Sequence, residues 1–504
     1  MPTSYIKQIL EARVYDVVEQ TPIDYASLLS SRIDNEVYIK REDLQPIHSF
    51  KIRGAYNHIA NLSEEKISKG VVAASAGNHA QGVAYAAQLL KVNATIVMPE
   101  TTPEIKVIFV KAYGAKVVLH GDTFDQALKL AISIAEENGS TFIHPYDDPA
   151  VIAGQGTIGM EILRQLSGKQ LDAVFIPVGG GGLISGIGTY IKYLRPEVKI
   201  IGVEAEDSAC MAAALKKNRR VRLSEVGLFA DGVAVAQVGK EPFRLAKNCI
   251  DEMVTVNTDE ICAAIKDIFE DTRSIAEPAG ALSVAGLKKY FSDKDLHGRS
   301  AVAINSGSNT NFDRLRHISE RTELGEHREV ILAVTIPEKP GSFRKFCQAL
   351  GKRNITEFNY RYADNSEAHV FVGAQISDSE NRDALIQRLR KKGYTVVDMS
   401  SNELAKLHIR HLVGGRSHGE QNEKLYRFEF PERPGALLSF LKGLGQEWNI
   451  SLFHYRNHGA AYGRVVVGFQ IAENDEKNIE KYMRDFGYRF WDESDNAAFK
   501  MFLS

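Results

Sequence analysis

Short apolar runs alternate with longer amphipathic segments through the first 310 residues, and this alternation limits the possible folds more than any other feature. The runs are nearly uninterrupted, which is typical of strands in a sheet covered on both faces. Alternation at this spacing favours a largely parallel α/β domain, or two such lobes. Ligands bind outside the carboxyl ends of such strands, so the residues that directly follow a strand are the candidates for a site.

The predicted elements form two sets. Strands are predicted at residues 70–74, 94–98, 116–120, 173–178, 199–204, 253–256 and 301–305. Helices are predicted at residues 79–90, 103–113, 124–138, 152–166 and 183–193.

Length and composition narrow the class of protein. The 504 residues suggest roughly three domains of ordinary size. A hydrophobic content of 44% and a net charge of −2 describe a globular protein with no electrostatic basis for binding nucleic acid. The four cysteines have no metal-like or redox-like spacing and suit a reducing compartment. No apolar run is long enough for a bilayer, and the N-terminus does not resemble a signal peptide, so we expect a cytoplasmic protein without a membrane partner.

The motif S-F-K-I-R-G-A at residues 49–55 opens a helical pattern. A lysine at this position, Lys51, is unusual because the positive end of the helix dipole repels an ammonium. That repulsion, together with partial burial, lowers a lysine pKa and frees the amine for Schiff-base chemistry. The alternative is a solvated lysine in a basic first turn.

Two loops between a predicted strand and a predicted helix are candidate anion sites. S-A-G-N-H at residues 75–79 offers backbone N–H groups to a carboxylate or phosphate, unless Ser75 or Asn78 merely caps the helix. G-G-G-G-L at residues 179–183 contains four consecutive glycines, which is entropically costly. Close approach of the backbone to a phosphate is the usual reason for such a run. A flexible hinge and a dinucleotide fingerprint are the alternatives.

Three further junctions follow predicted strands or precede helices. Ser306, in N-S-G-S-N at residues 305–309, can hydrogen-bond a heteroaromatic nitrogen or cap a helix. E-P-A-G at residues 277–280 and D-G-V-A at residues 231–234 face the same predicted site. None of the three is decisive alone.

The ordered set of motifs resembles a known family. S-F-K-I-R-G-A, S-A-G-N-H-A-Q-G, G-G-G-G-L, E-P-A-G and S-G-S-N together resemble the fold-type II pyridoxal-phosphate enzymes, specifically the serine/threonine dehydratases, over residues 5–320. The resemblance implies an α/β, tryptophan synthase β-like, two-lobed catalytic domain at residues 1–320, with the smaller lobe at about 40–145. It also implies pyridoxal 5'-phosphate as the cofactor.

The resemblance assigns roles residue by residue. Lys51 would be the Schiff-base lysine and would remove the Cα proton of the substrate, and Ser306 would face the pyridine nitrogen. Asn78 would contact the 3' oxygen of the cofactor. The phosphate would be cradled by Gly179, Gly180, Gly181, Gly182 and Leu183. The substrate carboxylate would be held by Ser75, Ala76, Gly77, Asn78 and His79.

The implied reaction is the dehydration and deamination of L-threonine, and of L-serine, to a 2-oxo acid and ammonia. The preference between the two substrates stays open, since one methyl group changes binding by only about 1–3 kcal/mol. No metal site is predicted, although a cation near Glu204 or Asp207 stays open.

The last 180 residues contain an internal repeat. P-E-K-P-G-S-F at residues 337–343 recurs as P-E-R-P-G-A-L at residues 431–437, and V-G-A-Q-I at 372–376 recurs as V-G-F-Q-I at 467–471. The period of roughly 95 residues is too long for a solenoid and indicates two duplicated domains. We expect a linker at residues 321–329, followed by domains at residues 330–402 and 424–495.

Each repeat predicts the order strand, helix, strand, strand, helix, strand of an α+β ferredoxin-like domain. The pair resembles the ACT-like regulatory domains of the biosynthetic threonine dehydratases. The resemblance implies the first step of isoleucine biosynthesis, inhibition by isoleucine, relief by valine, and a homotetramer. The candidate effector contacts are Gly341, Phe358, Asn359 and Tyr360 in the first repeat and Gly435, Phe453, His454 and Tyr455 in the second. A purely structural or oligomerising module is the alternative.

Two other functions compete with this interpretation. A β-replacing enzyme of the cysteine-synthase or cystathionine-synthase kind shares the fold and the cofactor, but those enzymes have other substrate-loop sequences and no such paired tail. An amino-acid-binding regulatory protein with an inactive catalytic lobe is the second alternative. The presence of Lys51, Asn78, the glycine run and Ser306 argues against it.

Overall fold

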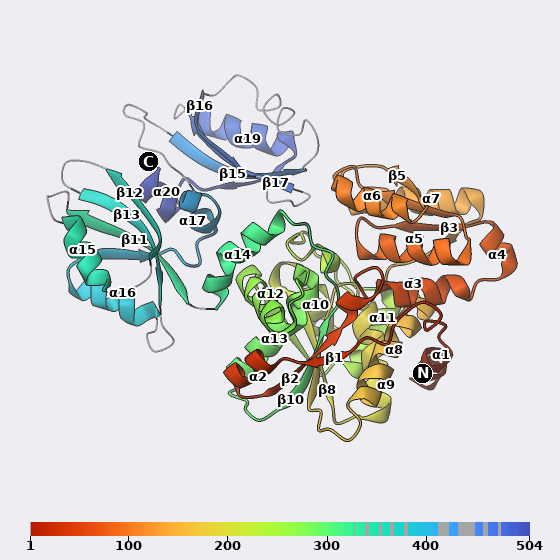
Figure 1. Cartoon of the computed structure of the whole chain (residues 1–504). Coiled ribbons are helices and arrows are strands. Elements are labelled where there is room, and N and C mark those ends of the chain that lie inside the picture. The colour runs from red at the N-terminus through yellow and green to blue at the C-terminus, as the bar shows by residue number, and fades with distance from the viewer. Residues whose placement is uncertain are drawn as a thin grey trace. The chain divides into compact units, whose positions relative to one another are not determined.

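The computed structural model describes residues 2–326, 328–337, 342–351, 355–362, 367–376, 382–411, 423–431, 449–456, 462–471 and 475–503. The chain divides into two compact units, Met1–Ser319 and Glu320–Ser504 (Figure 1). The first unit contains two lobes, each built on its own sheet.

The large lobe is built on a six-stranded sheet in the order β1-β2-β10-β7-β8-β9. Neighbouring strands are parallel except for β1 and β2. The strands are β1 (Ile23–Tyr25), β2 (Glu36–Arg41), β7 (Ala173–Pro177), β8 (Lys199–Ala205), β9 (Glu252–Val256) and β10 (Ser300–Asn305). The helices of this part of the chain are α1 (Pro2–Leu10), α2 (Ser27–Ile33), α8 (Pro149–Gln165), α9 (Gly182–Leu194), α10 (Cys210–Lys216), α11 (Lys240–Cys249), α12 (Thr258–Thr272) and α13 (Pro278–Asp293), with α14 (Arg314–Gly325) after the last strand.

Helices cover both faces of this sheet, as the uninterrupted apolar runs predict. Successive residues of β7 point to opposite faces, so Phe175 packs into the core formed with α12 and α13. Its neighbours Val174 and Ile176 pack into the core on the other side, together with apolar residues of α8 and α9. Both faces being buried explains why the strand shows no polar alternation.

The small lobe is built on a four-stranded parallel sheet in the order β5-β4-β3-β6. The strands are β3 (Val71–Ala74), β4 (Ala94–Met98), β5 (Lys116–Leu119) and β6 (Thr141–Phe142). The helices are α3 (Lys51–Ala60), α4 (Glu64–Ser68), α5 (Asn78–Leu90), α6 (Glu104–Ala112) and α7 (Phe124–Asn138). Residues of α7 form the core on one face, and residues of α3 and α5 contribute to the core on the other.

Every strand and helix predicted for the first unit is present, with ends displaced by at most a few residues. The largest displacement is at α8, which begins at Pro149 rather than at residue 152. The Asp148 carboxylate accepts hydrogen bonds from the backbone N–H groups of Ala150 and Val151 and so caps the helix. Proline is favoured at the first helical position, because its missing N–H would have no partner there.

The second unit contains two antiparallel four-stranded sheets, in the orders β12-β13-β11-β14 and β16-β17-β15-β18. The first repeat comprises β11 (Glu329–Pro337), α15 (Ser342–Leu350), β12 (Ile355–Tyr362), β13 (Glu367–Gln375), α16 (Arg382–Lys391), β14 (Thr395–Asp398) and α17 (Glu403–Leu407). The second comprises β15 (Glu423–Pro431), β16 (Asn449–Arg456), β17 (Tyr462–Gln470), α19 (Glu476–Phe486), β18 (Arg489–Asp492) and α20 (Ala497–Phe502). The predicted ferredoxin-like order is confirmed, although the first helix predicted for the second repeat lies outside the described residues.

The two repeats share one apolar core. Phe371 of the first repeat packs in the same cluster as Val466 and Phe502 of the second. Equivalent asparagines cap the two short helices of this core: Asn402 at α17 and Asn496 at α20. The Asn402 Nδ2 donates to Oδ1 of Asn496 at 3.0 Å, so the two caps are joined directly.

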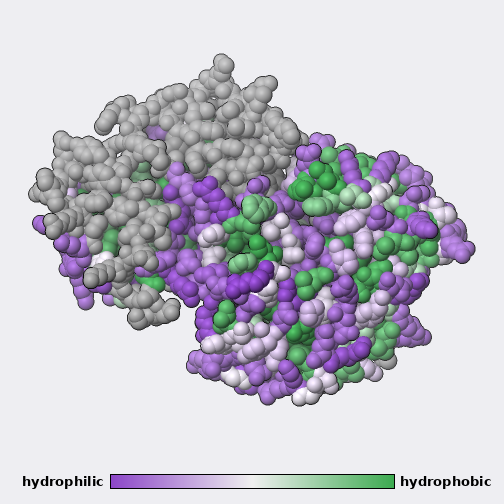
Figure 2. All heavy atoms as spheres, viewed as in Figure 1, coloured by the Kyte–Doolittle hydropathy of each residue, from purple (hydrophilic) through white to green (hydrophobic). Residues whose placement is uncertain are grey.

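Hydrophilic residues cover most of the face of the first unit drawn in Figure 2, and hydrophobic residues gather there in separate patches. One patch lies over α6, whose Ile105, Ile108 and Phe109 are each about half exposed. Within the described residues, no helix has both the length and the apolar character that crossing a bilayer requires.

Candidate active site

Lys51 is the first residue of α3, and the segment after β10 holds the chain in front of it. Ser49 and Gly307 form an isolated antiparallel bridge. The backbone N–H of Phe50 donates to the carbonyl of Ser306 at 3.2 Å. These contacts fix the point at which α3 begins, and therefore the position of the lysine.

Lys51 is partly buried, and its Nζ donates a hydrogen bond to the Pro145 carbonyl at 3.1 Å. Burial lowers its pKa to about 8, and the nearby Glu277 carboxylate opposes that shift. Burial is thus the main cause of the lowered pKa. A much larger fraction of this amine is neutral near neutral pH than for an ordinary lysine, and the neutral form is the nucleophile and the base.

Helix α3 is held by two close contacts with glycines of neighbouring helices. A Cβ at Gly82 of α5 would lie 3.2 Å from the carbonyl of Lys51. A Cβ at Gly154 of α8 would lie 2.6 Å from the carbonyl oxygen of Arg53. Both neighbours are backbone atoms, which cannot move aside, so the two glycines set the position of the first turn of α3.

The glycine loop after β7 is closely packed. Gly181 has φ +94°, a conformation that favours glycine. A Cβ at Gly180 would lie 2.2 Å from Cγ of Tyr146, and a Cβ at Gly182 would lie 3.0 Å from the Tyr146 carbonyl oxygen. The loop leads directly into α9, whose first N–H groups have no intrahelical acceptor. This packing argues against a flexible hinge and leaves a helix N-terminus suited to an anion.

Asn78 is oriented by two side chains from distant parts of the chain. Its Nδ2 donates to Oε1 of Glu277 at 2.6 Å, and its Oδ1 accepts from Nδ2 of Asn309 at 2.7 Å. Glu277 is buried, which raises its pKa to about 7, and the neighbouring Asp231 carboxylate acts in the same direction. The amide of Asn78 is therefore fixed with its oxygen and nitrogen distinguished.

In the loop at residues 75–79, the backbone is more available to a ligand than the side chains are. The Ser75 Oγ accepts from the N–H of Gly77 at 3.2 Å, and no side chain caps α5. A Cβ at Gly77 would meet no atom within 4 Å, so the backbone there is open to a ligand. His79 bonds the Ile143 carbonyl through Nε2, and burial lowers the pKa of His79 to about 3. The imidazole is therefore neutral, and its Nε2 is engaged in the hydrogen bond to Ile143.

Ser306 lies at the carboxyl end of β10 and is buried. Its Oγ donates only a long hydrogen bond, 3.4 Å, to the Ala279 carbonyl. The next described helix, α14, begins at Arg314, so Ser306 caps no helix. Among the described residues, the buried polar atoms of Ser49 and Asn305 beside it have no hydrogen-bond partner within the chain, which suits a polar ligand at this place.

The predicted effector residues lie largely beyond what the structure describes. Gly341 and Gly435 are outside the described residues. Phe358, Asn359 and Tyr360 belong to β12, and Phe453, His454 and Tyr455 belong to β16, but their side chains also lie outside it. Both strands are edge strands of their sheets.

No group of three His, Cys, Asp or Glu side chains among the described residues could hold a metal ion. Glu204, near which a cation was considered, accepts hydrogen bonds from the backbone N–H groups of Met211 and Ala212 at 2.7 and 2.9 Å. Its burial raises the pKa of the carboxyl to about 7.

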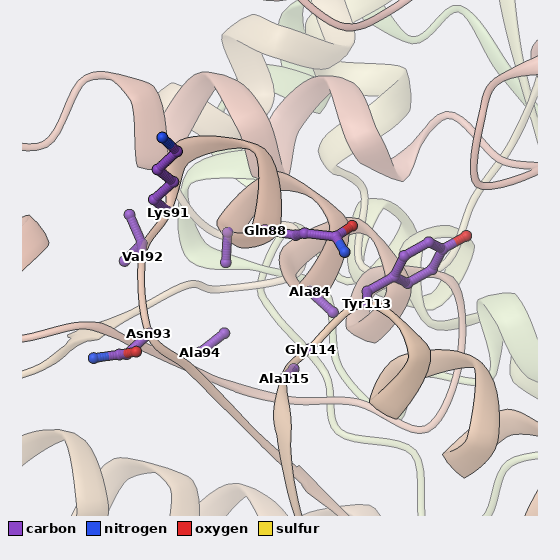
Figure 3. Close-up of a pocket in the computed structure, with 10 residues that line it drawn as sticks. Ala84, Gln88, Lys91, Val92, Asn93, Ala94, Tyr113, Gly114 and Ala115 are labelled. Carbon is purple, nitrogen blue, oxygen red and sulfur yellow. The ribbon is translucent and has the colours of Figure 1, made fainter.

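A shallow pocket between the C-terminal ends of α5 and α6 is separate from these residues (Figure 3). Its lining includes Gln88, Lys91, Asn93 and Tyr113 and none of the predicted site residues. The Gln88, Lys91 and Asn93 side chains are exposed, so nothing there resembles a built site.

Sequence reasoning missed how several residues meet at the site. Glu277 and Asp231 belong to the E-P-A-G and D-G-V-A motifs, but no local sequence pattern indicates that Glu277 contacts Asn78. Tyr146, whose ring lies against Gly180, follows a two-residue strand that has no detectable period. Lys106 and Arg314 lie on helices whose charges suggest only solvated faces, yet both contact Asp231.

Comparison with known families gives two matches. The family described as "Pyridoxal-phosphate dependent enzyme" matches residues 14–307. The family described as "C-terminal regulatory domain of Threonine dehydratase" matches twice, at residues 320–409 and 414–503.

Individual proteins are similar over the whole chain. The biosynthetic L-threonine dehydratase of Pasteurella multocida is 53% identical over 500 residues, covering 99% of this chain and 97% of that protein. The mitochondrial threonine dehydratase of Saccharomyces cerevisiae is 50% identical over 513 residues, covering 99% and 89%. Among solved structures, the processed form of threonine deaminase isoform 2 from Solanum lycopersicum has a TM-score of 0.62 at 50% identity, covering 64% of this chain and 93% of that one.

Proposed function

This chain belongs to the pyridoxal-phosphate dependent enzymes, within the biosynthetic threonine dehydratases, and we propose that isoleucine inhibits it and valine relieves the inhibition through the two C-terminal repeats. Its reaction is the dehydration and deamination of L-threonine to 2-oxobutanoate and ammonia, with L-serine as a second substrate. The observation that carries this function is the Lys51 amine, whose pKa burial lowers to about 8 and which donates to the carbonyl of Pro145, the residue before the Tyr146 that packs on the glycine loop.

The residues of this chain fit pyridoxal 5'-phosphate. Lys51 would hold the aldehyde, and the N–H groups of Gly179 to Leu183 would hold the phosphate, because side chains are absent where the backbone must come close. Asn78 would contact the 3' oxygen and Ser306 the pyridine nitrogen. The unpartnered polar atoms of Ser49 and Asn305 support a polar group at this place. When bound, the cofactor acts as the electron sink for the substrate Cα.

Lys51 also serves as the general base. Its neutral Nζ takes the Cα proton of the substrate, and such proton transfer typically contributes about 10²–10⁴-fold to the rate. Burial favours the neutral form that the step requires, while the Glu277 carboxylate stabilises the ammonium that results.

The backbone at residues 75–79 holds the substrate carboxylate. The N-terminus of α5 supplies N–H groups and the positive end of the helix dipole. Because His79 is neutral and bonded to Ile143, its contribution is its backbone N–H and not its imidazole.

Regulation is supported by the duplicated domain, in which each copy carries a P-G motif that the sequence predicts to open a helix. Backbone N–H groups at such a turn suit the carboxylate of an amino acid. The residues proposed to contact effectors are those of the P-G turns and of β12 and β16, in the setting of a homotetramer. The expected cytoplasmic location stays a prediction, since similar proteins include bacterial and mitochondrial ones.

Steady-state turnover of threonine and serine, with and without isoleucine and valine, tests this function. We expect 2-oxobutanoate from threonine alone, inhibition by isoleucine, and recovery when valine is added. A requirement for a second nucleophilic substrate would favour a β-replacing enzyme. A turnover rate that neither isoleucine nor valine changes would indicate that the repeats have a structural role.

A further inference from the structure

One carboxylate, Asp231, joins the two lobes of the catalytic unit. Asp231 begins the short 3₁₀ helix η3 (Asp231–Val233) of the large lobe. Its Oδ2 lies 2.7 Å from Nζ of Lys106, which belongs to α6 of the small lobe. Its Oδ1 lies 3.3 Å from Nη1 of Arg314, which also donates to the Phe229 carbonyl. Two cations, one from each side of the lobe boundary, thus share Asp231.

This bridge lies directly against the pair formed by Glu277 and Asn78. A Cβ at Gly232, the residue after Asp231, would lie 3.4 Å from Oε1 of Glu277 and 4.0 Å from Nδ2 of Asn78. The hydrogen bond between Asn78 and Glu277 also crosses the boundary, because α5 belongs to the small lobe and Glu277 precedes α13 of the large lobe. Lys106 and Asn78, both from the small lobe, therefore contact the large lobe at adjoining places.

Four charged groups face Glu277, each from a different element. Asp231 of η3 raises the pKa of Glu277, as burial does to a greater extent, while Lys106 of α6 and Arg314 of α14 lower it. The fourth is Lys51 of α3, whose pKa Glu277 raises in turn. When the small lobe is docked, Lys106 and the Asn78 amide both favour the carboxylate form of Glu277.

We propose that Lys106 is a positioning residue whose ion pair with Asp231 holds the small lobe against the large lobe, and that this contact is linked to the charge state of Glu277. The proposal rests on the proposed function in one respect, the identity of the substrate. Docking of α6 on Asp231 favours ionised Glu277, and ionised Glu277 favours docking by the same factor, since such linkage is reciprocal. The ionised carboxylate then stabilises the ammonium that Lys51 becomes on taking the substrate proton.

A second ion pair across the same boundary provides a matched control. Arg222 and Asp125 of α7 pair at the surface, with both side chains more than half exposed. Exposed pairs of this kind contribute little, because water screens them. This pair therefore crosses the lobe boundary without contacting Asp231 or Glu277 in any described contact.

The test compares Lys106→Met, Lys106→Arg and Asp125→Asn in the full-length holoenzyme. The measurements are kcat and KM for threonine and the pH dependence of the Kd for L-2-aminobutanoate, which lacks the leaving hydroxyl. For Lys106→Met we expect KM and Kd to rise about tenfold, within the usual range of coupling between sites. The midpoint of the Kd profile that reports Glu277 should move to higher pH, because a charge that lowers this pKa is lost. Lys106→Arg should restore both properties, and Asp125→Asn should change neither.

Two results would overturn the proposal. If the Kd rises while the midpoint of its pH profile stays the same, Lys106 contributes only an ordinary contact between the lobes. A moved midpoint with unchanged Kd and KM would show that the charge state of Glu277 is not linked to substrate binding. Lys106→Gln serves as a second variant should Lys106→Met fold poorly. If the unmodified enzyme does not turn over threonine, the proposed function fails, while the binding profiles still decide the role of Lys106.

Discussion

The guanidinium of Arg53 and the carboxylate of Glu161 form a fully buried ion pair, with 2.6 Å between Nη1 and Oε1. Glu42 accepts from Nε and Nη2 of the same guanidinium at 2.8 Å, and Lys40 donates to the other oxygen of Glu161 at 2.6 Å. The four formal charges cancel, and none of the four side chains is exposed. The network ties β2 and α8 to the first turn of α3, two residues from Lys51.

Arg53→Met should destabilise the catalytic unit strongly, because Glu42 and Glu161 lose a cation that they cannot replace inside the protein. Breaking a buried pair from one side typically costs about 3–5 kcal/mol. Urea unfolding followed by circular dichroism measures the loss. Arg13→Met is the control, since Arg13 and Asp16 pair with about half of each side chain exposed and should contribute less than about 1 kcal/mol. Equal effects of the two variants would contradict the importance of burial.

Gly180→Ala should weaken binding of pyridoxal 5'-phosphate, because the added Cβ would overlap the ring of Tyr146 and displace the loop. Overpacking of this kind typically costs about 1–3 kcal/mol. Equilibrium titration of the apoenzyme with the cofactor measures the change. The double variant Gly180→Ala with Tyr146→Ala removes the overlap and should recover part of the affinity. Unchanged weak binding in the double variant would show that the clash is not the cause.

The Lys51 amine should titrate near pH 8 in the apoenzyme, because burial lowers its pKa from the usual value of about 10.4. Acylation by acetic anhydride requires the neutral amine, so the labelling rate of Lys51 should rise with pH and reach half of its maximum near pH 8. Mass spectrometry of peptides that contain residue 51 gives that rate. In Glu277→Gln the midpoint should fall further, since the group that stabilises the ammonium is lost. A midpoint near 10.4 in the unmodified protein would contradict the assigned environment.

Ser306→Asp should slow dehydration and allow transamination as a side reaction. A neutral hydroxyl does not stabilise a protonated pyridine nitrogen, whereas a carboxylate does, and protonation increases delocalisation of the electrons from the Cα–H bond. Assays of 2-oxobutanoate and of the aminated cofactor measure the two outcomes. Ser306→Ala is the neutral control and should give no transamination. Full dehydratase activity in Ser306→Asp without a side reaction would count against this role.

A chain ending at residue 325, after α14, should be active on threonine and insensitive to isoleucine. Effector coupling is typically about 1–3 kcal/mol, or roughly 5–150-fold in affinity, and the truncation removes the repeats that are proposed to supply it. Inhibition curves of the full-length and truncated enzymes provide the comparison. Undiminished inhibition of the shorter chain would place the isoleucine site in the catalytic unit.

Sequence reasoning succeeded where the signal was local. The glycines at residues 179–182, the lysine at the start of α3 and the asparagine at the start of α5 each follow from the neighbouring strand or helix pattern. The repeated P-G motif similarly predicts two equivalent domains, and the structure contains two sheets with the same strand order.

The sequence alone does not predict contacts between residues that are distant in the chain. Charged residues such as Arg53 and Lys40 are usually found on a solvated face. Both are fully buried here, because they form ion pairs with Glu42 and with Glu161 of α8. The bond between Asn78 and Glu277 likewise depends on how the two lobes meet. No periodicity in the chain encodes such distances.

The hydrogen bond between the helix caps Asn402 and Asn496 means that a substitution in one repeat affects the other. Since α20 completes a core that also contains Phe371, a substitution in α20 would change the packing of the first repeat, more than a hundred residues earlier in the sequence. Residues of the two repeats that meet in this core therefore have to fit one another in size and shape.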